Sequence, residues 1–375
     1  MEVYFSIITD VRDKSYITYK LSDILFIEVC AHICGMRDAE EIADFAEERW
    51  EFFKQYMDYE RLPCALTFEN ILAEIDAKQL DLCLQGIFRN VLNIRINRKD
   101  TQTCIDGKTV CGVNGLHIVT AMMADYFAPV ASLAVDSKTN EIPIVQELLD
   151  MINVEGSIIS MDALHCQEET LAKIIDKKGD YVVQVKRNQE SLYDDIEGLF
   201  KLGKIADKHM TMDKGHGRFE KRICTVLADE IVNQEYFSKW KGIQKIFKVE
   251  RKTEKKGITT EEISYYISSK NATAEQLLSY TRKHWQIESF HWILDKVMHE
   301  DHSLIRDKNT QLCLNIIRKF AISIVKNYIE TASPKKKTIS GNMRKCLLNP
   351  EFLLAVLDIF CPDFYYIFVT FIFSP

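Results

Sequence analysis

The middle of the chain alternates between short runs with strand character and segments with helical spacing. After Lys99, β-branched and apolar residues dominate three successive runs, and two further runs each follow a segment whose apolar residues recur every three to four positions. The strand-like runs cover residues 103–112, 116–127, 130–139, 157–164 and 180–187, and the helical segments cover residues 142–152 and 167–179. The predicted order is therefore strand, strand, strand, helix, strand, helix, strand.

This order is typical of a mixed α/β sheet of the ribonuclease H type. Two of the predicted strand segments carry an aspartate, Asp106 in TCIDGKTV and Asp162 in SIISMDAL. Carboxylates at the strand ends of such a sheet gather at one edge. We therefore expect Asp106 and Asp162 to lie on adjacent strands.

A third carboxylate, Glu288, lies in a long helix predicted over residues 272–298. An apolar stripe along this helix consists of Ile287, Phe290, Leu294 and Val297. A neighbouring polar stripe consists of His284, Glu288, His291 and Asp295. Glu288 can thus face the sheet edge while the helix stays packed. On periodicity alone, the alternative is a solvated polar face with ordinary side-chain pairs.

Asp106, Asp162 and Glu288 together form the ligand set that a site for two Mg²⁺ ions requires. Carboxylate oxygens suit this hard cation, for which Mn²⁺ can substitute. Two such ions can activate water and stabilise a leaving 3′ oxygen in phosphodiester cleavage. The three carboxylates therefore point toward cutting and joining of nucleic acid. Zinc is not expected, because Cys104 and Cys111 have no second Cys or His pair at zinc-finger spacing.

The segments around this core differ in character. Apolar residues at helical spacing predict a small all-helical accessory domain over residues 1–95. The catalytic core is expected over residues 96–330, with a strand-rich insertion at about 204–269. Residues 331–375 are expected to form a basic and then hydrophobic C-terminal tail.

Four residues mark expected helix ends in the N-terminal segment. Asp38 and Thr67 are plausible N-caps, because a short polar side chain there can accept a hydrogen bond from the first helical turn. Gly35 and Gly86 are plausible C-terminal ends.

The charge of the chain is unevenly distributed. The net charge is −7, yet residues 303–348 carry ten Lys or Arg against two acidic residues, and residues 1–95 carry ten basic against eighteen acidic residues. A basic run is usually a solvated face. Because this one follows the third carboxylate directly, DNA contact is about equally plausible, and the acidic N-terminal segment is a poor phosphate binder.

The cysteines and the end of the chain bear on location. Eleven cysteines at irregular positions, without a secretory segment at the N-terminus, fit a reducing cytosol better than a disulfide framework. The apolar run at residues 364–373 is too short for a membrane span, which needs roughly 20 residues. A cytoplasmic protein with no membrane partner is expected.

Several motifs occur together and in order. They are IDGK from Ile105, LAVDSKTNEIP, MDALHCQ, HGRFE from His216, YYISS, and HWQIESFHWILD. Together they resemble those of the H-repeat-associated, ISAs-group transposases, a branch of the DDE insertion-sequence transposases. The similarity runs from about residue 21 to about residue 354, and six ordered motifs are a specific signal, whereas IDGK alone would be weak.

The resemblance implies that Asp106, Asp162 and Glu288 are the catalytic, metal-binding triad of a ribonuclease H-like core. It also implies a transposase that binds two Mg²⁺ ions, cleaves DNA at the transposon ends and joins the freed 3′ end to target DNA. The implied partner is double-stranded DNA, with a homodimer assembled on it. The implied location is the bacterial cytoplasm at the nucleoid.

Six residues are candidate DNA contacts. Glycines flank the basic turn at His216, where backbone can approach phosphate, although a plain hairpin turn explains the same pattern. Lys108 points to the same side of its strand as Asp106 and either pairs with that carboxylate or contacts DNA. The full set is Lys108, Lys186, His216, Arg218, Arg282 and His284.

The sequence also departs from related transposases around Glu288. Tyr280 and Arg282 lie one and two residues early, His284 stands where an Arg is usual, and Asp295 occupies the place of a Lys. The resemblance implies that these changes are a feature of the H-repeat-associated branch, and they bear on which of these residues contact phosphate.

A second departure concerns the segment VKRNQ, which resembles a Lys-Gly-Asn-Gln motif. Arg187 replaces the glycine there, and a larger side chain can alter the rim of the site.

Two alternatives to an active transposase remain open from the sequence. One is a nuclease of the same fold that cuts without strand transfer, and the other is a catalytically inactive DNA-binding transposon remnant.

Two tryptophans of the predicted long helix, Trp285 and Trp292, can stack on a flipped base. At helical spacing in an apolar sequence, however, core packing is their more common role.

Overall fold

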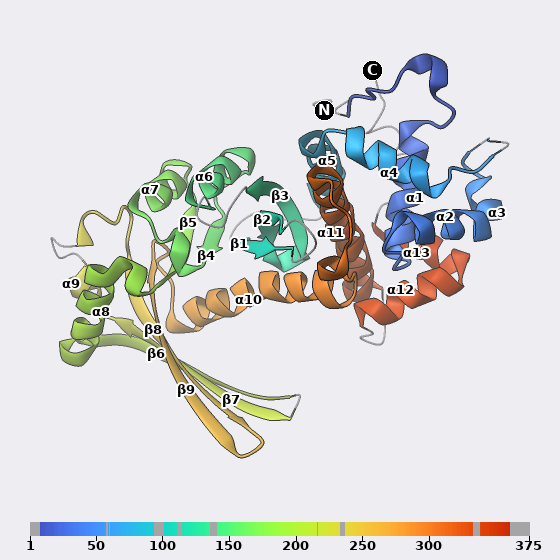
Figure 1. The fold of residues 1–375 in the computed structure, drawn as a ribbon. Coiled ribbons are helices and arrows are strands. Elements are labelled where there is room, and N and C mark those ends of the chain that lie inside the picture. The colour runs from blue at the N-terminus through green and yellow to red at the C-terminus, as the bar shows by residue number, and fades with distance from the viewer. Residues whose placement is uncertain are drawn as a thin grey trace.

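A computed structural model shows a large mixed sheet with helices on both faces and a helical region at one end (Figure 1). The nine strands run in the order β3-β2-β1-β4-β5-β9-β8-β7-β6. The structure describes residues 8–57, 59, 61–93, 101–110, 115–135, 141–215, 217–232, 237–332 and 338–360.

The first five strands have the pairing expected of a ribonuclease H-like core. β1 pairs antiparallel with β2, which pairs antiparallel with β3, and β1, β4 and β5 run parallel to one another. The bounds are β1 Gln102–Thr109, β2 His117–Met123, β3 Ala128–Val135, β4 Ile158–Met161 and β5 Asp180–Val185. The predicted mixed α/β fold is confirmed.

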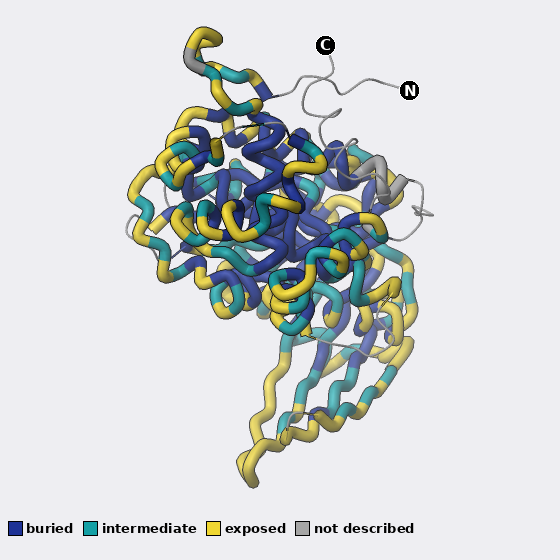
Figure 2. Tube along the Cα trace, turned by 90° about the vertical axis from the view of Figure 1, so that its right-hand side faces the viewer, coloured by how far each residue is buried: buried dark blue, intermediate teal, exposed yellow. Residues whose placement is uncertain are grey.

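The strand-rich insertion extends this sheet. Its last strand, β9, pairs antiparallel with β5, so its four antiparallel strands continue the core sheet. Figures 1 and 2 show its hairpins projecting away from the rest of the molecule. The bounds are β6 Ile205–Gly215, β7 Arg218–Leu227, β8 Lys245–Lys255 and β9 Ile258–Ser268.

Helices cover the two faces of the sheet differently. Side chains that alternate along a strand point to opposite faces. Ile105 belongs to the hydrophobic core that includes residues of helices α6, α7 and α8, whereas Cys104 faces α10. These helices are α6 Glu141–Met151, α7 Glu168–Asp176, α8 Glu190–Leu202 and α10 Ala274–Lys296; a short α9 spans Asp229–Val232. Short 3₁₀ turns are η1 Lys14–Tyr16, η2 Ala124–Tyr126, η4 Ala163–His165, η5 Arg187–Gln189 and η7 Glu300–His302.

The N-terminal helices share one hydrophobic core with the helices that follow α10. All thirteen residues of α1 are buried, because α11 and other helices surround it. The helices are α1 Leu21–Ile33, α2 Ala39–Glu48, α3 Trp50–Phe53, α4 Ala65–Glu74, α5 Ala77–Asn93, α11 Lys308–Thr331, α12 Ile339–Leu348 and α13 Pro350–Phe360. The segment expected as a tail thus begins with two packed helices.

Some of the basic side chains in the C-terminal region of residues 303–348 are buried and do not lie on the surface. Arg318 and Lys319 are buried in α11, where Arg318 donates to the Arg37 carbonyl at 2.8 Å and Lys319 donates to the Thr120 hydroxyl at 2.6 Å. Residues 333–337 lie outside the described residues. The ten positive charges of this region therefore do not form one continuous phosphate-binding face.

Two of the four expected helix ends are confirmed. The Asp38 side chain accepts from the Glu41 N–H at the start of α2, and Gly35 follows α1 with φ +93°. Thr67 is not an N-cap, because α4 already begins at residue 65. Gly86 does not end a helix either, since the buried apolar residues on both sides of it carry α5 onward.

No helix in the described ranges is both long enough and apolar enough to cross a membrane. The apolar run at residues 364–373 lies outside those ranges.

Candidate active site

Asp106 and Asp162 lie at neighbouring strand positions. Ile105 of β1 and Met161 of β4 are register partners, and each aspartate is the next residue. Asp106 is still within β1, whereas Asp162 is the N-cap of the turn η4. The expectation that adjacent strands bring these two carboxylates together is met.

Glu288 reaches the same place from the helix that crosses the sheet. A capping box of Thr273 and Gln276 begins α10, and buried Ile287, Phe290 and Leu294 hold it in place. Asp106, Asp162 and Glu288 all line one pocket of about 280 Å³. The pocket therefore combines carboxylates from two strand ends and one helix.

The electrostatics of the pocket reflect this crowding of acids. Burial raises the pKa of Asp106 to about 7, and the charges of Asp162 and Glu288 add to the effect. Burial followed by the Asp162 charge also raises the pKa of Glu288. Burial acts to raise the pKa of Asp162, but the Ala163 N–H and the Lys186 ammonium outweigh it and lower that pKa. Such repulsion is what a bound cation relieves.

Two histidines of α10 border the carboxylates as neutral imidazoles. His291 Nδ1 lies 3.6 Å from Asp106 Oδ2, and burial lowers the pKa of His291 to about 3. His284 Nδ1 lies 3.1 Å from the Ser160 hydroxyl, and burial lowers the pKa of His284 to about 4. Neither imidazole competes as a cation for the carboxylates near neutral pH.

Lys186 stands at the rim of the pocket. Its ammonium donates to Asp162 Oδ1 at 3.0 Å, and its side chain is 54% exposed. The next residue, Arg187, points the other way, toward Asp194 at 3.3 Å and over the Tyr193 ring. The larger side chain at the glycine position of the motif therefore packs on α8 and does not line the pocket.

Lys108 does not pair with Asp106. Its ammonium lies 2.7 Å from Asp295, 2.8 Å from Glu300 and 3.4 Å from Asp301, and its side chain is only 9% exposed. Buried among three carboxylates, it is not available to DNA. The structure therefore contradicts both expectations for Lys108, the pairing with Asp106 and the contact with DNA.

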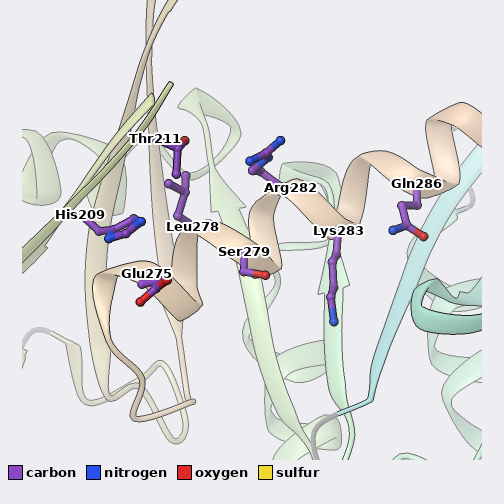
Figure 3. Close-up of a pocket in the computed structure, with 8 residues that line it drawn as sticks. All are labelled: His209, Thr211, Glu275, Leu278, Ser279, Arg282, Lys283 and Gln286. Carbon is purple, nitrogen blue, oxygen red and sulfur yellow. The ribbon is translucent and has the colours of Figure 1, made fainter. Parts of the chain in front are cut away.

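The remaining candidate contacts lie on the inserted strands and on α10. Arg218 begins β7 opposite Gly215, which fits the hairpin interpretation, and it lies 3.3 Å from Glu220. Arg282 lies 3.1 Å from Asp213 and lines a second pocket of about 370 Å³ (Figure 3). Figure 3 shows Arg282 and Lys283 leaving α10 in different directions. His216 lies outside the described residues.

The interpretation of the two tryptophans as core residues is wrong. Trp285 is 50% and Trp292 59% exposed, because both lie on the face of α10 that turns away from the apolar stripe. The Arg251 guanidinium sits 5.3 Å from the centre of the Trp285 ring, at the edge of the carboxylate pocket.

Sequence reasoning identified Arg218 but missed that Arg222 and Arg251 complete an arginine cluster beside this pocket. Buried Glu220 accepts from Arg222 at 2.8 Å and also from Arg251, and Arg218 is nearby. The signal was available, since Arg218, Glu220 and Arg222 alternate along a strand and so share one face.

The donor set of the pocket fits divalent magnesium or manganese. It consists of three carboxylates, and the neighbouring histidines are neutral. Burial, with a smaller contribution from the other two carboxylates, raises the pKa of Asp106. In the described part of the chain, no three His, Cys, Asp or Glu side chains are already gathered around a single metal position. Binding would therefore require Asp106, Asp162 and Glu288 to close onto the ion.

Comparison with known proteins defines the class. Residues 69–324 match the family described as "Transposase DDE domain", and residues 3–87 match a family described as associated with that domain. Because the first match covers more than half of the chain, the protein belongs to the DDE transposase family.

Similar proteins of known sequence indicate which branch of the DDE transposase family the chain resembles. The chain is 33% identical over 373 residues to "H repeat-associated putative transposase YhhI" of Escherichia coli K12, covering 94% of this chain and 96% of the relative. It is 32% identical over 373 residues to "Putative transposase YncI" of Escherichia coli O157:H7, covering 94% and 93%. The resemblance to the H-repeat-associated branch is confirmed.

Two further similarities are partial or distant. "Inactive transposase YbfQ" of Escherichia coli K12 is 38% identical over 72 residues, covering 19% of this chain and 86% of that one. A solved piggyBac transposase synaptic complex with hairpin DNA aligns with a TM-score of 0.44 and 12% identity, covering 97% of this chain and 80% of that one.

Proposed function

We propose that this protein cleaves DNA at the ends of its transposon and joins the freed 3′ ends to target DNA. The observation that carries the proposal is the shared pocket of Asp106, Asp162 and Glu288, in which burial, with a smaller contribution from the two like charges, raises the pKa of Asp106 to about 7. Membership in the DDE transposase family supports the same reaction class.

Asp106, Asp162 and Glu288 are the residues that would hold two Mg²⁺ ions, with Mn²⁺ as a substitute. When bound, such ions lower the pKa of coordinated water and stabilise a leaving 3′ oxygen. Glu288 is the exposed member of the set, so its side chain has room to turn toward the two aspartates. Asp106 must give up the proton that its raised pKa retains near neutral pH.

The surroundings of the pocket favour a DNA strand as its ligand. Lys186 and Arg282 are about half exposed, and each can exchange its carboxylate partner for a phosphate. His284 is neutral and bonded to Ser160, so it borders the strand without adding charge. We propose double-stranded DNA as the partner, a homodimer as the assembled form, and the bacterial nucleoid as the place of action.

The test uses purified protein, Mg²⁺ or Mn²⁺, and DNA that carries the terminal repeats flanking this gene. Joined products are the expected result. Cut ends without joining would support a nuclease of the same fold, and a mobility shift without cutting would support an inactive DNA-binding remnant.

Replacing Asp162 by Asn should abolish cutting while DNA binding is kept or strengthened, because the change removes a metal ligand and a negative charge. Asp150→Asn on the exposed surface of α6 is the matched control, and it should cut normally. Normal cutting by Asp162→Asn would remove Asp162 from the site.

A further inference from the structure

The turn that follows β4 determines where the Asp162 carboxylate points. β4 ends at Met161, so Asp162 has left the strand ladder, and its position depends on η4, Ala163–His165. Within this turn the His165 N–H donates to the Asp162 carbonyl at 3.1 Å, and the Cys166 N–H donates to the Ala163 carbonyl at 3.1 Å. The Gln167 N–H also donates to the His165 carbonyl at 2.9 Å, and the Ala163 N–H donates to Asp162 Oδ1 at 2.5 Å. All of these hydrogen bonds are local to the turn, and each contributes only about 1 kcal/mol.

Two side-chain amides from the end of the neighbouring strand hold this turn. The Asn188 Nδ2 donates to the Ala163 carbonyl at 2.7 Å. The Gln189 Nε2 donates to the Cys166 carbonyl at 2.8 Å and to the Gln167 side chain at 3.2 Å. Both amides come from η5, which directly follows β5. The backbone of the Asp162 turn is thus tied to the adjacent strand on both sides of His165.

The inner side of the turn is held separately. His165 Nε2 lies 3.3 Å from Glu141, which also lies 2.8 Å from His117, and all three side chains are buried. On the outer side, the two amides hold the backbone of the turn to the end of β5, and the Lys186 ammonium contacts the Asp162 carboxylate. If they are lost, the inner contact still anchors the fold while the carboxylate end of the turn is released.

We propose that Asn188 and Gln189 are positioning residues that hold the Asp162 carboxylate in place for the metal. The inference rests on the proposed function, because its consequence is measured at the metal site. It also explains the segment Lys186 to Gln189 as one unit: Lys186 contacts the Asp162 carboxylate itself, and the two amides fix the backbone beneath it.

The test compares Asn188→Leu and Gln189→Met with the wild-type chain. Each change keeps the approximate size of the side chain and removes the amide N–H donor. Arg187→Gln is the matched control, because Arg187 lies between the same neighbours in sequence and contacts α8 instead of the turn. Mn²⁺ affinity is measured by calorimetry, and local opening by hydrogen exchange of the amides of residues 165–167 in metal-free protein.

We expect each amide variant to bind Mn²⁺ about fivefold more weakly, the factor that corresponds to one ordinary hydrogen bond. Exchange at residues 165–167 should be faster in both variants, while the Arg187→Gln control matches wild type. A lower unfolding midpoint with unchanged Mn²⁺ affinity and unchanged exchange would show a merely structural role and overturn the proposal.

The wild-type measurement separates this inference from the proposed function. If wild-type protein bound no Mn²⁺, the metal site itself would fail and the positioning role with it. If wild type bound Mn²⁺ and both amide variants bound it equally well, only the positioning role would fail.

Discussion

Gly107, the residue after Asp106, has no room for a side chain. A Cβ atom at this position would lie 2.7 Å from His117 Nε2 and 2.8 Å from Glu141 Oε2, both of them buried groups. Because residue 107 of the IDGK motif is a glycine, the side chains of His117 and Glu141 can contact the backbone of β1 directly. The motif is explained by packing beside the site as well as by its aspartate.

We predict that Gly107→Ala lowers the free energy of unfolding by about 1–3 kcal/mol, the usual range for overpacking a buried position. Gly86→Ala in α5 is the control, because its Cβ would meet nothing within 4 Å. That change should be neutral or stabilising by up to about 1 kcal/mol. Urea unfolding measures both, and equal midpoints for the two variants would refute the packing explanation.

At this scale the sequence predicted which carboxylates meet but not how their neighbours behave. Asp106, Asp162 and Glu288 were found because strand and helix periods are local properties. The sequence did not predict the partners of Lys108, because Glu300 and Asp301 come close to it only through the turn that follows α10. Such contacts depend on chain direction after a helix, which periodicity does not encode.

Among the elements, β1 and the end of α10 are joined by the buried Lys108 cluster. Lys108 lies two residues from Asp106, and Asp295 lies two helical turns from Glu288, so their 2.7 Å contact links the strand and the helix of the site. Asn315 of α11 extends the cluster by donating to Glu300 at 2.9 Å. The cluster therefore ties the sheet, α10 and α11 together.

Replacing Lys108 by Met should lower the free energy of unfolding by about 3 kcal/mol, the lower end of the range for breaking a buried ion pair. Buried Glu300 keeps Arg318 at 3.7 Å, and Asp295 and Asp301 are partly exposed. Lys78→Met is the control, since Lys78 and Glu147 form an exposed pair worth less than about 1 kcal/mol. The comparison is made by urea unfolding at pH 7. A loss no larger than that of the control would show that the cluster contributes little.

The helix α1 buries a second acid and base pair, Glu28 and His32. Glu28 Oε2 lies 3.6 Å from His32 Nε2, and neither Glu28 oxygen has a hydrogen-bond partner within the described part of the chain. Burial raises the pKa of Glu28 to about 8 and lowers the pKa of His32 to about 3. Both groups are therefore uncharged in the folded chain near neutral pH.

These shifts predict how stability depends on pH. Between its usual value and 8 the folded Glu28 binds more protons than the unfolded chain, so stability falls as pH rises. The His32 shift acts in the opposite direction below its usual pKa of 6.5. From pH 6.5 to 8 the His32 effect has ended, and the Glu28 shift removes up to about 2 kcal/mol of stability. Asp106, whose pKa is raised to about 7, adds a smaller decline that ends near pH 7.

Glu28→Gln should remove most of this decline and leave only the smaller part due to Asp106, whereas Glu69→Gln on the exposed face of α4 should keep all of it. Urea unfolding at pH 6.5 and pH 8 makes the comparison. The same slope in Glu28→Gln and wild type would contradict a protonated, buried Glu28.

The order of the first five strands could be predicted from the sequence, but the attachment of the inserted strands could not. Pairing of β9 with β5 joins residues 80 to 86 positions apart, and nothing in the sequence of either strand specifies its partner. Helix α8 was missed although its signal was present, since buried Leu192 and Ile196 recur at helical spacing.

For the whole molecule, the α10 face of the sheet is the expected DNA face. The carboxylate pocket, Lys186 and Arg282 all lie there, whereas α8 covers the opposite face of the inserted strands through Phe200 and Tyr265. The net charge of −7 means that DNA binding must rely on such local positive groups.

We predict that Lys186→Gln and Arg282→Gln each reduce the slope of DNA affinity against salt concentration by about one. Lys201→Gln on α8, a comparably exposed lysine, is the control and should leave the slope unchanged. Fluorescence anisotropy across a salt series gives the slopes. A control slope that falls as much as the others would place the DNA on a different face.

The claim on which this account depends is that Asp106, Asp162 and Glu288 together bind divalent cations. Anomalous diffraction from crystals grown with Mn²⁺ tests it most directly. The account predicts an anomalous peak in the pocket with oxygens of all three carboxylates at coordination distances of about 2.0–2.6 Å. A peak elsewhere, or a peak held by the two aspartates with Glu288 turned away, would contradict it.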